Sequence, residues 1–360
     1  MAFDPPPRGK QRLVVIGNGM AGMRTVEELI KLAPELYDVT VIGAEPHPNY
    51  NRILLSPVLA GEQTIDDIVI NPVAWYAEQG ITLHLGTTVQ KILRAQRKVV
   101  ATTADGATVE PPYDRLLLAT GSNPFMLPIP GAKLPGVITY RDIADTHAMI
   151  DAAANYKRAV VIGGGLLGLE AANGLKLRGM DVTVVHVMPW LMERQLDRTA
   201  GALLQTSLEE RGLNFLLQTQ TTELLADPLT GRVRALKHRP AADKDATPAE
   251  LETDLVVMAV GIRPNTTLAE SAGLHCNRGI SVNDTLQTYD PRIYAVGECV
   301  AHRGIAYGLV APLYEQARVA ANHLAQMGIG RYLGSVTSTK LKVTGIDLFS
   351  AGDFCGATRP

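Results

Sequence analysis

Hydrophobic residues gather into short strand-like runs, each followed by a segment with helical spacing. The runs RLVVIG at 12–17 and RAVVIG at 158–163 are rich in valine and isoleucine and end in glycine, which is typical of buried parallel strands. Apolar residues then recur at helical spacing over 23–33 and 169–179. A further strand, DVTVIGAEP or DVTVVHV, follows each helix. The pattern predicts two β-α-β units in an α/β protein.

Antiparallel elements are predicted between the parallel strands. The segment KVVATTADGATV at 98–109 contains an Asp-Gly turn and predicts a hairpin, and YDRLLLATGSNP at 113–124 predicts a strand that ends in small residues. The polar stretch at 237–252 fits either a solvated hairpin loop, which we favour, or a disordered linker. A late helix is expected within 308–328, entered at Pro312. The two halves therefore repeat one architecture.

The composition bears on the number of domains and on the ligands and partners to expect. The 360 residues, 46% of them hydrophobic, can bury a large core in two or three domains. Basic and acidic residues number 34 and 36 without long runs of either sign, so no nucleic acid or anionic membrane is expected as a partner. No stretch resembles a signal peptide or a membrane span, and we expect a cytoplasmic protein. Cys276, Cys299 and Cys355 form no C-x-x-C pair, so redox chemistry would need a cofactor.

The first glycine phrase, VVIGNGMAG at 14–22, stands between a predicted strand and a predicted helix. Gly17 permits the tight turn, Gly19 lets the backbone approach a pyrophosphate, and Gly22 allows close packing of helix on strand. A plain tight turn is the alternative. The next strand ends near Glu45, a carboxylate placed to bind ribose hydroxyls, which favours a dinucleotide site.

The phrase VVIGGGLLG at 160–168 repeats this arrangement with Gly163, Gly165 and Gly168. Two such units predict two dinucleotide sites. Hydride transfer between two cofactors needs each one held in its own phosphate cradle, so we expect one flavin and one nicotinamide nucleotide. The residues that open the two helices belong to the same predicted sites: Met20, Ala21, Leu166 and Leu167.

Together with these phrases, LLLATGS, VVMAVGIRPN and TYDPRIYAVGE resemble the pyridine-nucleotide–flavin oxidoreductases, which have two nested dinucleotide-binding domains. A narrower resemblance, to the N-terminal FAD and NAD(P)H module of the assimilatory NAD(P)H nitrite reductase large subunits, rests on GGGLLGLEAA, MERQLD, YAVGEC, GLVAP and STKLKVTGIDLFSAGD. The resemblance implies two nested Rossmann-like domains with a truncated C-terminal β segment.

The resemblance also implies domain boundaries. An FAD-binding domain would comprise 12–124 and 259–332, after a flexible tail at 1–11, and an NAD(P)H-binding domain would comprise 125–258. An incomplete C-terminal interface domain would begin within 333–360, where STKLKVTGIDL predicts a strand with an exposed edge. In this class such a domain forms a dimer interface, so a homodimer is one expectation.

In the FAD site, the resemblance implies that Gly17, Gly19 and Gly22 hold the pyrophosphate and that Glu45 holds the adenosine ribose. Related reductases often carry this carboxylate one position earlier, where this chain has Ala44.

Other FAD contacts follow from the same resemblance. Arg52 would lie near the adenine dinucleotide, the alternative being a solvated surface arginine, while Pro57 replaces a lysine that related reductases place beside the flavin. Thr120 and Gly121 match the turn that passes close to FAD.

The last FAD contacts lie late in the chain. Gly297 and Glu298 would bind a ribityl or phosphate-side hydroxyl, a structural glutamate being the alternative. Backbone N–H groups from Gly308 and Leu309 to Pro312 would face the N1 and O2 side of the flavin.

On the nicotinamide side, the resemblance implies that Gly163, Gly165 and Gly168 receive the second pyrophosphate and that Gly261 joins this site. Glu170, expected on the first helical turn, would position the nicotinamide or the flavin edge, which makes it the one candidate catalytic residue; an idle helix-dipole glutamate is the alternative.

His186 stands where an NADH-specific site would place Asp or Glu against the adenosine 2′-hydroxyl. No arginine follows directly to bind a 2′-phosphate, so we expect weak discrimination with a preference for NADH. The alternative is a histidine that points to solvent.

Two further patterns could suggest a function but fit a structural role better. Cys299 and His302 have metal-like spacing but lack a second ligand pair, so we expect no metal and a packing role for Cys299. The apolar residues of MPWLMERQL at 188–196 have helical spacing and fit core better than a partner groove.

The function implied is an electron-entry module. NAD(P)H would deliver hydride to flavin N5, and electrons would pass singly to an external sirohaem or iron–sulfur domain or subunit, or to a small redox protein. With no cysteine cluster, the chain itself is not expected to reduce nitrite. Alternatives are a rubredoxin or ferredoxin reductase, a nitrate reductase electron-transfer subunit, and a nucleotide-binding redox sensor with little turnover.

Overall fold

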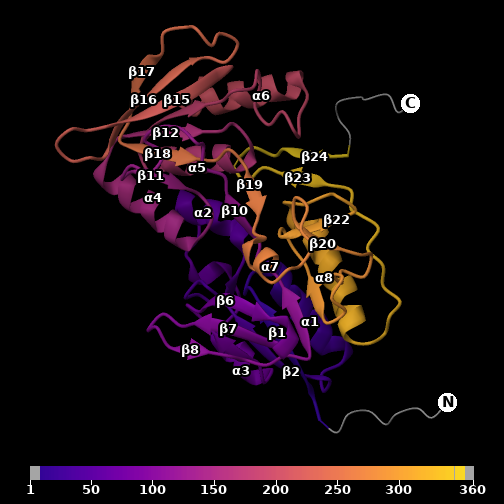
Figure 1. Ribbon diagram of the computed structural model, residues 1–360. Coiled ribbons are helices and arrows are strands. Elements are labelled where there is room, and N and C mark those ends of the chain that lie inside the picture. Colours follow the sequence, from indigo (N-terminus) through magenta and orange to yellow (C-terminus); the bar gives the residue numbers. More distant parts are fainter. Residues whose placement is uncertain (1–8, 344, 353–360) are drawn as a thin grey trace. The chain divides into compact units, whose positions relative to one another are not determined.

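The computed structural model describes residues 9–343 and 345–352, and its two five-stranded parallel sheets belong to separate units (Figure 1). The first unit takes in the chain up to Asn51 together with Val69–Asn123 and Arg263–Thr337. The second takes in Arg52–Ile68, Pro124–Ile262 and the chain from Ser338. The predicted α/β class with two Rossmann-like sheets is confirmed.

The sheet of the first unit has the strand order β21-β9-β1-β2-β5. Its strands are parallel, and β1 pairs along its whole length with β2, because both present runs of buried valine, leucine and isoleucine to the core. Their bounds are β1 (Gln11–Ile16), β2 (Tyr37–Ile42), β5 (Thr82–His84), β9 (Arg115–Leu118) and β21 (Ile293–Ala295).

Helices α1 (Met20–Leu32) and α8 (Val310–Leu324) pack against each other in this unit. Helix α8 begins two residues before the expected entry at Pro312. Proline is tolerated at the third helical position, because the first backbone N–H groups of a helix have no intrahelical acceptor. The predicted helix is therefore present with a corrected start.

The predicted Asp-Gly hairpin is confirmed. Strands β6 (Thr88–Leu93), β7 (Lys98–Thr102) and β8 (Thr108–Val109) form an antiparallel sheet. Its turn closes through the N–H of Gly106, which donates to the carbonyl of Thr103 at 3.0 Å. The unit's smaller elements are β3 (Asn49–Tyr50), β4 (Val69–Asn71), α3 (Val73–Glu78), η3 (Arg94–Gln96), α7 (Thr267–Ser271), β20 (Ile280–Val282) and β22 (Val300–His302).

The second unit repeats the parallel architecture with the strand order β11-β18-β12-β13-β14. The strands are β11 (Val137–Thr139), β12 (Arg158–Ile162), β13 (Asp181–Val185), β14 (Asn214–Leu216) and β18 (Leu255–Met258). The helices are α2 (Leu55–Ala60), α4 (Ile143–Asn155), α5 (Leu166–Leu177) and α6 (Arg198–Glu209), with 3-10 turns η1 (Arg52–Leu54) and η2 (Asp66–Ile68) nearby in sequence. Strands β10 (Ser122–Pro124) and β19 (Ile262–Pro264) lie where the chain passes from one unit to the other.

The polar stretch at 237–252 forms the solvated hairpin that we favoured over a linker. Strands β15 (Thr219–Ala226), β16 (Val233–Pro240) and β17 (Ala249–Glu252) make an antiparallel sheet, and the stretch supplies the end of β16, the loop and β17. Within the loop, Asp243 accepts the N–H groups of Asp245 and Ala246 at 3.0 and 3.1 Å.

Two other expectations need correction. The segment MPWLMERQL is a series of turns and not a helix, although Leu191, Met192 and Leu196 are buried as the core reading predicts. Among the described residues of STKLKVTGIDL, the first three form the short strand β23 (Ser338–Lys340), which pairs antiparallel with β24 (Phe349–Ala351).

Residues 52–68, which the sequence analysis placed in the first domain, group with the second unit. Helix α2 packs on α5 there, because Gly174 leaves room for Leu59: a Cβ at Gly174 would lie 2.6 Å from Leu59 Cγ. Arg178 also donates from Nη2 to the carbonyl of Val58 at 3.1 Å. The other crossings, at 123–124, 262–263 and 337–338, lie within five residues of the expected boundaries, but the chain from Ser338 groups with the second unit and not as a domain of its own. Among the described residues, no helix is long and apolar enough to span a bilayer.

Candidate functional site

The first glycine turn joins β1 to α1 by close backbone packing. Gly17 has φ +111°, donates its N–H to the carbonyl of Ile42 at 2.8 Å, and would place a Cβ only 2.1 Å from the carbonyl oxygen of Ala119. A Cβ at Gly22 would lie 2.8 Å from the carbonyl oxygen of Gly17. Both positions therefore require glycine for packing.

Gly19 differs from its two neighbours because space lies beside it. It is the N-cap of α1, its φ of −85° suits any residue, and a Cβ there would meet no described atom within 4 Å. No side chain of the described residues caps the helix. Met20 and Ala21 begin α1 at this point. An open backbone surface at an uncapped helix N-terminus fits a pyrophosphate, as the sequence predicts.

Side chains around the first turn hold fixed positions. Glu45 is half-buried and accepts a hydrogen bond from the Tyr50 hydroxyl at 2.7 Å, whereas Ala44 is exposed. Thr120 donates its hydroxyl to the carbonyl of Asn265 at 2.8 Å, and Gly121 has φ +65°. The carboxylate available near the end of β2 is therefore that of Glu45.

A second turn of the first unit carries Gly297 and Glu298. Gly297 has φ +92°, and its N–H donates to Oε1 of Gln316 at 2.9 Å. Glu298 accepts a hydrogen bond from the Ser122 hydroxyl at 2.8 Å. Gln316 is fully buried on α8. Gln316 was not among the predicted site residues, although a glutamine at an apolar position of a helix can mark such a contact.

Gly308 and Leu309 lead into α8, where Leu309 is the N-cap and no described side chain caps the helix. Its first N–H groups are thus free of side-chain capping, as the predicted role near a flavin requires.

The second unit reproduces the first turn closely. Gly163 has φ +120°, donates its N–H to the carbonyl of Val185 at 2.9 Å, and would place a Cβ 2.3 Å from the carbonyl oxygen of Ala259. A Cβ at Gly168 would lie 2.0 Å from the carbonyl oxygen of Gly163. The sequence repeat is therefore also a repeat of three-dimensional contacts.

Gly165 occupies the open position of this second turn. It is the N-cap of α5 with no described side-chain cap, and a Cβ there would meet no described atom within 4 Å. Leu166 and Leu167 begin the helix, and Gly261, with φ +116°, also has open space beside it. The residues present fit a second pyrophosphate.

Glu170 is the fifth residue of α5 and not part of its first turn, which corrects the sequence analysis. Only 6% exposed, it accepts hydrogen bonds from the Ser56 hydroxyl at 2.5 Å and from the N–H of Lys342 at 2.9 Å. The hydroxyl of Tyr140 donates to Ser56 at 3.4 Å. Burial raises the pKa of Glu170 to about 7, against the opposing effect of these hydrogen bonds. The Glu170 carboxyl is therefore buried and hydrogen-bonded within the second unit.

Arg52 lies in the second unit, where it donates from Nη1 to the carbonyl of Arg141 at 2.6 Å and is half-buried. It is therefore not a fully solvated surface arginine. Pro57, in place of the family's lysine, lies in α2 of the same unit.

His186 is buried and does not point to solvent. Its Nδ1 accepts the N–H of Gly164 at 3.1 Å, and its Nε2 lies 3.1 Å from a carboxylate oxygen of Glu193. The imidazole thus braces the second glycine turn, which spacing in the sequence could not reveal.

Cys299 is fully buried, which agrees with the packing role expected for it. His302 faces Asp284, with Nε2 2.9 Å from Oδ1. Over residues 9–343 and 345–352, no group of three or more His, Cys, Asp and Glu side chains could hold a metal ion. Cys355 lies outside the described residues.

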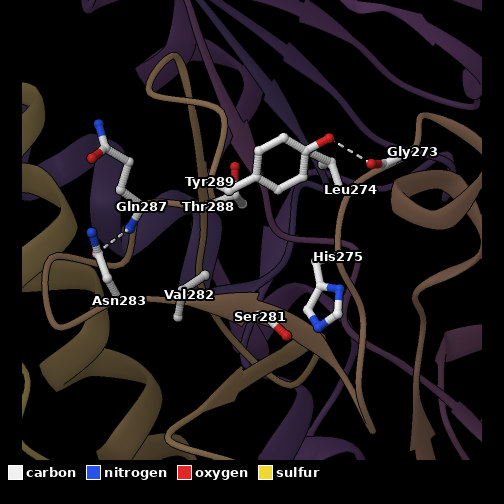
Figure 2. A pocket seen from close by; sticks show the side chains of 9 residues that line it. All are labelled: Gly273, Leu274, His275, Ser281, Val282, Asn283, Gln287, Thr288 and Tyr289. Atoms are coloured by element: carbon white, nitrogen blue, oxygen red, sulfur yellow. Dashed lines mark hydrogen bonds between the residues drawn. The ribbon is translucent and has the colours of Figure 1, made fainter.

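A cavity of about 680 Å³ in the first unit is not built from the predicted site residues (Figure 2). Two of its polar contacts are internal to the lining: the Tyr289 hydroxyl donates to the carbonyl of Gly273 at 2.6 Å, and Asn283 accepts the N–H of Gln287 at 3.1 Å. This cavity therefore does not support a dinucleotide site.

Comparisons with known proteins agree with this geometry. The chain is 57% identical over 346 residues to the nitrite reductase [NAD(P)H] of Bacillus subtilis, covering 96% of this chain and 41% of that protein. It is 50% identical over 343 residues to the assimilatory nitrate reductase electron transfer subunit of the same organism, covering 95% and 43%. The chain thus spans less than half the length of these relatives.

A solved structure with the same fold is the covalent putidaredoxin reductase–putidaredoxin complex, with a TM-score of 0.85, 28% identity, and coverage of 96% of this chain and 82% of that one. The family model for pyridine nucleotide-disulphide oxidoreductases matches residues 11–323. The resemblance drawn from the sequence is confirmed. The chain belongs to the pyridine nucleotide-disulphide oxidoreductase family, whose members and structural neighbours are FAD-dependent NAD(P)H oxidoreductases.

Proposed function

We propose that this chain is the reductase module that takes electrons from NAD(P)H and delivers them to a metal centre outside the chain, as part of a nitrite reductase. The first unit would hold FAD and the second NAD(P)H. The observation that carries the proposal is the duplicated turn, in which Gly19 and Gly165 each leave open space at an uncapped helix N-terminus. Each turn supplies one pyrophosphate cradle.

When bound, FAD supplies the chemistry of accepting a hydride and releasing electrons singly. The chain's own residues bind and orient. Glu45 would hold ribose hydroxyls, Glu298 with Ser122 would hold a hydroxyl of the chain that links adenine to flavin, and the α8 N-terminus would stabilise negative charge. Glu170 would position the nicotinamide.

The relatives support an external acceptor. They are named for nitrite reduction and for electron transfer in nitrate assimilation, while this chain has three cysteines in all and cannot supply a four-cysteine cluster. Under the proposal, the sirohaem or iron–sulfur centre belongs to a further domain or subunit, or the acceptor is a small redox protein. Cys276 and Cys299 are free thiols, as suits the cytoplasmic location that the proposal includes.

The first test is stopped-flow spectroscopy of the FAD-reconstituted protein mixed with NADH or NADPH. We expect one FAD per chain, rapid bleaching of its absorbance, and turnover with ferricyanide but not with nitrite. Protein without FAD serves as the control.

A protein that cannot retain FAD would refute the assignment of the first unit. Slow bleaching that never supports ferricyanide turnover would favour a redox sensor, and reduction of nitrite by this chain would contradict the external metal centre. Rapid turnover with rubredoxin or a ferredoxin as acceptor would redirect the proposal to a small redox protein.

A further inference from the structure

The second glycine turn has a carboxylate beside it that does not come from the usual position. Strand β13 ends at Val185, and the next residue is His186 where an NADH site normally has Asp or Glu. Seven residues later, Glu193 brings Oε2 to 3.1 Å from Nε2 of His186. An acidic group therefore reaches this part of the second unit by a different route.

The large and the small residue at the glycine turn stand at opposite positions in the two units. In the first unit Asn18 lies inside the turn and Gly43 follows β2, and a Cβ at Gly43 would lie 2.8 Å from the Cβ of Asn18. In the second unit Gly164 lies inside the turn, and a Cβ there would lie 2.8 Å from Cγ of His186. His186 thus fills the space that Asn18 fills in the first unit, which makes it a support of the turn.

The hydrogen bonds orient both side chains. Because Nδ1 of His186 accepts the N–H of Gly164, Nε2 carries the proton and donates to Glu193. This hydrogen bond lowers the pKa of the Glu193 carboxyl, which is therefore ionised at neutral pH.

The chain around Glu193 is also fixed to the turn. Met192, buried and with φ +53°, donates its N–H to the carbonyl of Gly164 at 2.9 Å. The Glu193 side chain keeps 21% of its surface exposed, so its carboxylate is held on one side and accessible on another.

We infer that Glu193, held in place by His186, selects NADH over NADPH in the second unit. Its carboxylate accepts a hydrogen bond from the adenosine ribose and repels a 2′-phosphate. His186 is a positioning residue that acts through Glu193. The inference rests on the proposed function of the second unit as the NAD(P)H-binding unit.

Arg194 would favour the opposite preference, for NADPH over NADH. It is exposed and directly follows Glu193, and a guanidinium at a 2′-phosphate would favour NADPH. The experiment must therefore separate the two neighbouring charges.

The experiment is calorimetric titration of the FAD-reconstituted chain with NAD⁺ and NADP⁺, and with 5′-AMP and adenosine 2′,5′-bisphosphate, at fixed ionic strength. We expect the wild type to bind NAD⁺ at least about tenfold more tightly than NADP⁺, and Glu193→Gln to reduce this ratio about tenfold, chiefly by tightening NADP⁺. His186→Asn should change the ratio in the same direction, because asparagine can still accept the Gly164 N–H but cannot reach Glu193.

Glu210→Gln is the matched control, since it removes the same charge from an exposed position after α6. It should leave the ratio unchanged, as should Arg194→Gln. Thermal midpoints and FAD content verify that each variant is folded.

An unchanged ratio in Glu193→Gln would overturn the inference while leaving the proposed function intact, and so would a wild type that prefers NADP⁺ and loses that preference in Arg194→Gln. A wild type that binds none of the four ligands would overturn the proposed function and the inference with it.

Discussion

At the scale of single residues, Glu170 shows what spacing along a chain can and cannot predict. The glycine phrase located it next to the second glycine turn, but its partners Ser56 and Lys342 come from distant segments, as does Tyr140, which donates to Ser56. Contacts across more than a hundred residues are set by tertiary packing, which no local pattern encodes. The contacts of His186 with Gly164 and Glu193 join residues that are closer in the chain, but they too depend on how the turns fold and not on residue spacing.

Burial of Glu170 makes the protein's stability depend on pH. Its pKa is about 7 in the folded protein and 4.5 as the ordinary value, so between these pH values the unfolded chain releases a proton that the folded protein keeps. Stability attributable to Glu170 is therefore complete below about pH 4.5 and falls as the pH rises to about 7. When the pH rises from 5 to 8, we expect the free energy of unfolding of Glu170→Gln to increase by about 1 to 3 kcal/mol relative to that of the wild type.

Urea unfolding of both proteins at the two pH values measures this difference. Glu210→Gln serves as the exposed control and should follow the wild type. If the wild-type and Glu170→Gln curves shift in parallel with pH, Glu170 is already ionised when folded.

At the scale of elements, most strands and helices could be predicted because each has one dominant period. The valine-rich runs became the strands of the parallel sheets, and both hairpins formed where turn residues separate apolar runs. The apolar residues of MPWLMERQL have helical spacing, but the buried ones lie on a series of turns tied to Gly164. Apolar spacing predicted burial there correctly but not the backbone conformation.

The glycines of one turn predict two different mutant phenotypes. Gly165→Val should keep the free energy of unfolding within about 1 kcal/mol of the wild-type value, because φ is −84° and the space beside the residue is open. It should nevertheless weaken NAD⁺ binding more than about tenfold, because the valine side chain would fill the phosphate cradle. Gly168→Ala should destabilise by about 2 kcal/mol, because its Cβ would overlap the carbonyl oxygen of Gly163.

Thermal unfolding and NAD⁺ titration of the two variants distinguish these effects. FAD content is the internal control and should match the wild type in Gly165→Val. Equal loss of FAD and NAD⁺ in that variant would show that the two turns do not serve separate ligands.

At the scale of the whole molecule, two units of one architecture predict two separable ligand responses. At a concentration 100 times its dissociation constant, each ligand should stabilise the unit that binds it by about 3 kcal/mol. Gly19→Val should abolish the thermal shift caused by FAD and retain the shift caused by NAD⁺, and Gly165→Val should do the reverse, since both positions are open N-caps.

Differential scanning calorimetry of the apoprotein with each ligand tests this reciprocity. Loss of both shifts in Gly19→Val would mean that the nicotinamide nucleotide binds only after FAD.

The interleaving of the two units sets an order for folding during synthesis. The parallel sheet of the second unit is complete once β18 has left the ribosome, since its five strands lie between Val137 and Met258. The first unit has by then four strands of its sheet and still lacks β21 and α8, which come after residue 292. The second unit, which begins later in the chain, therefore completes its parallel sheet first. Until β21 is synthesised, the edge of β9 in the first unit stays unpaired. A nascent chain arrested shortly after β18 would expose that edge to chaperones.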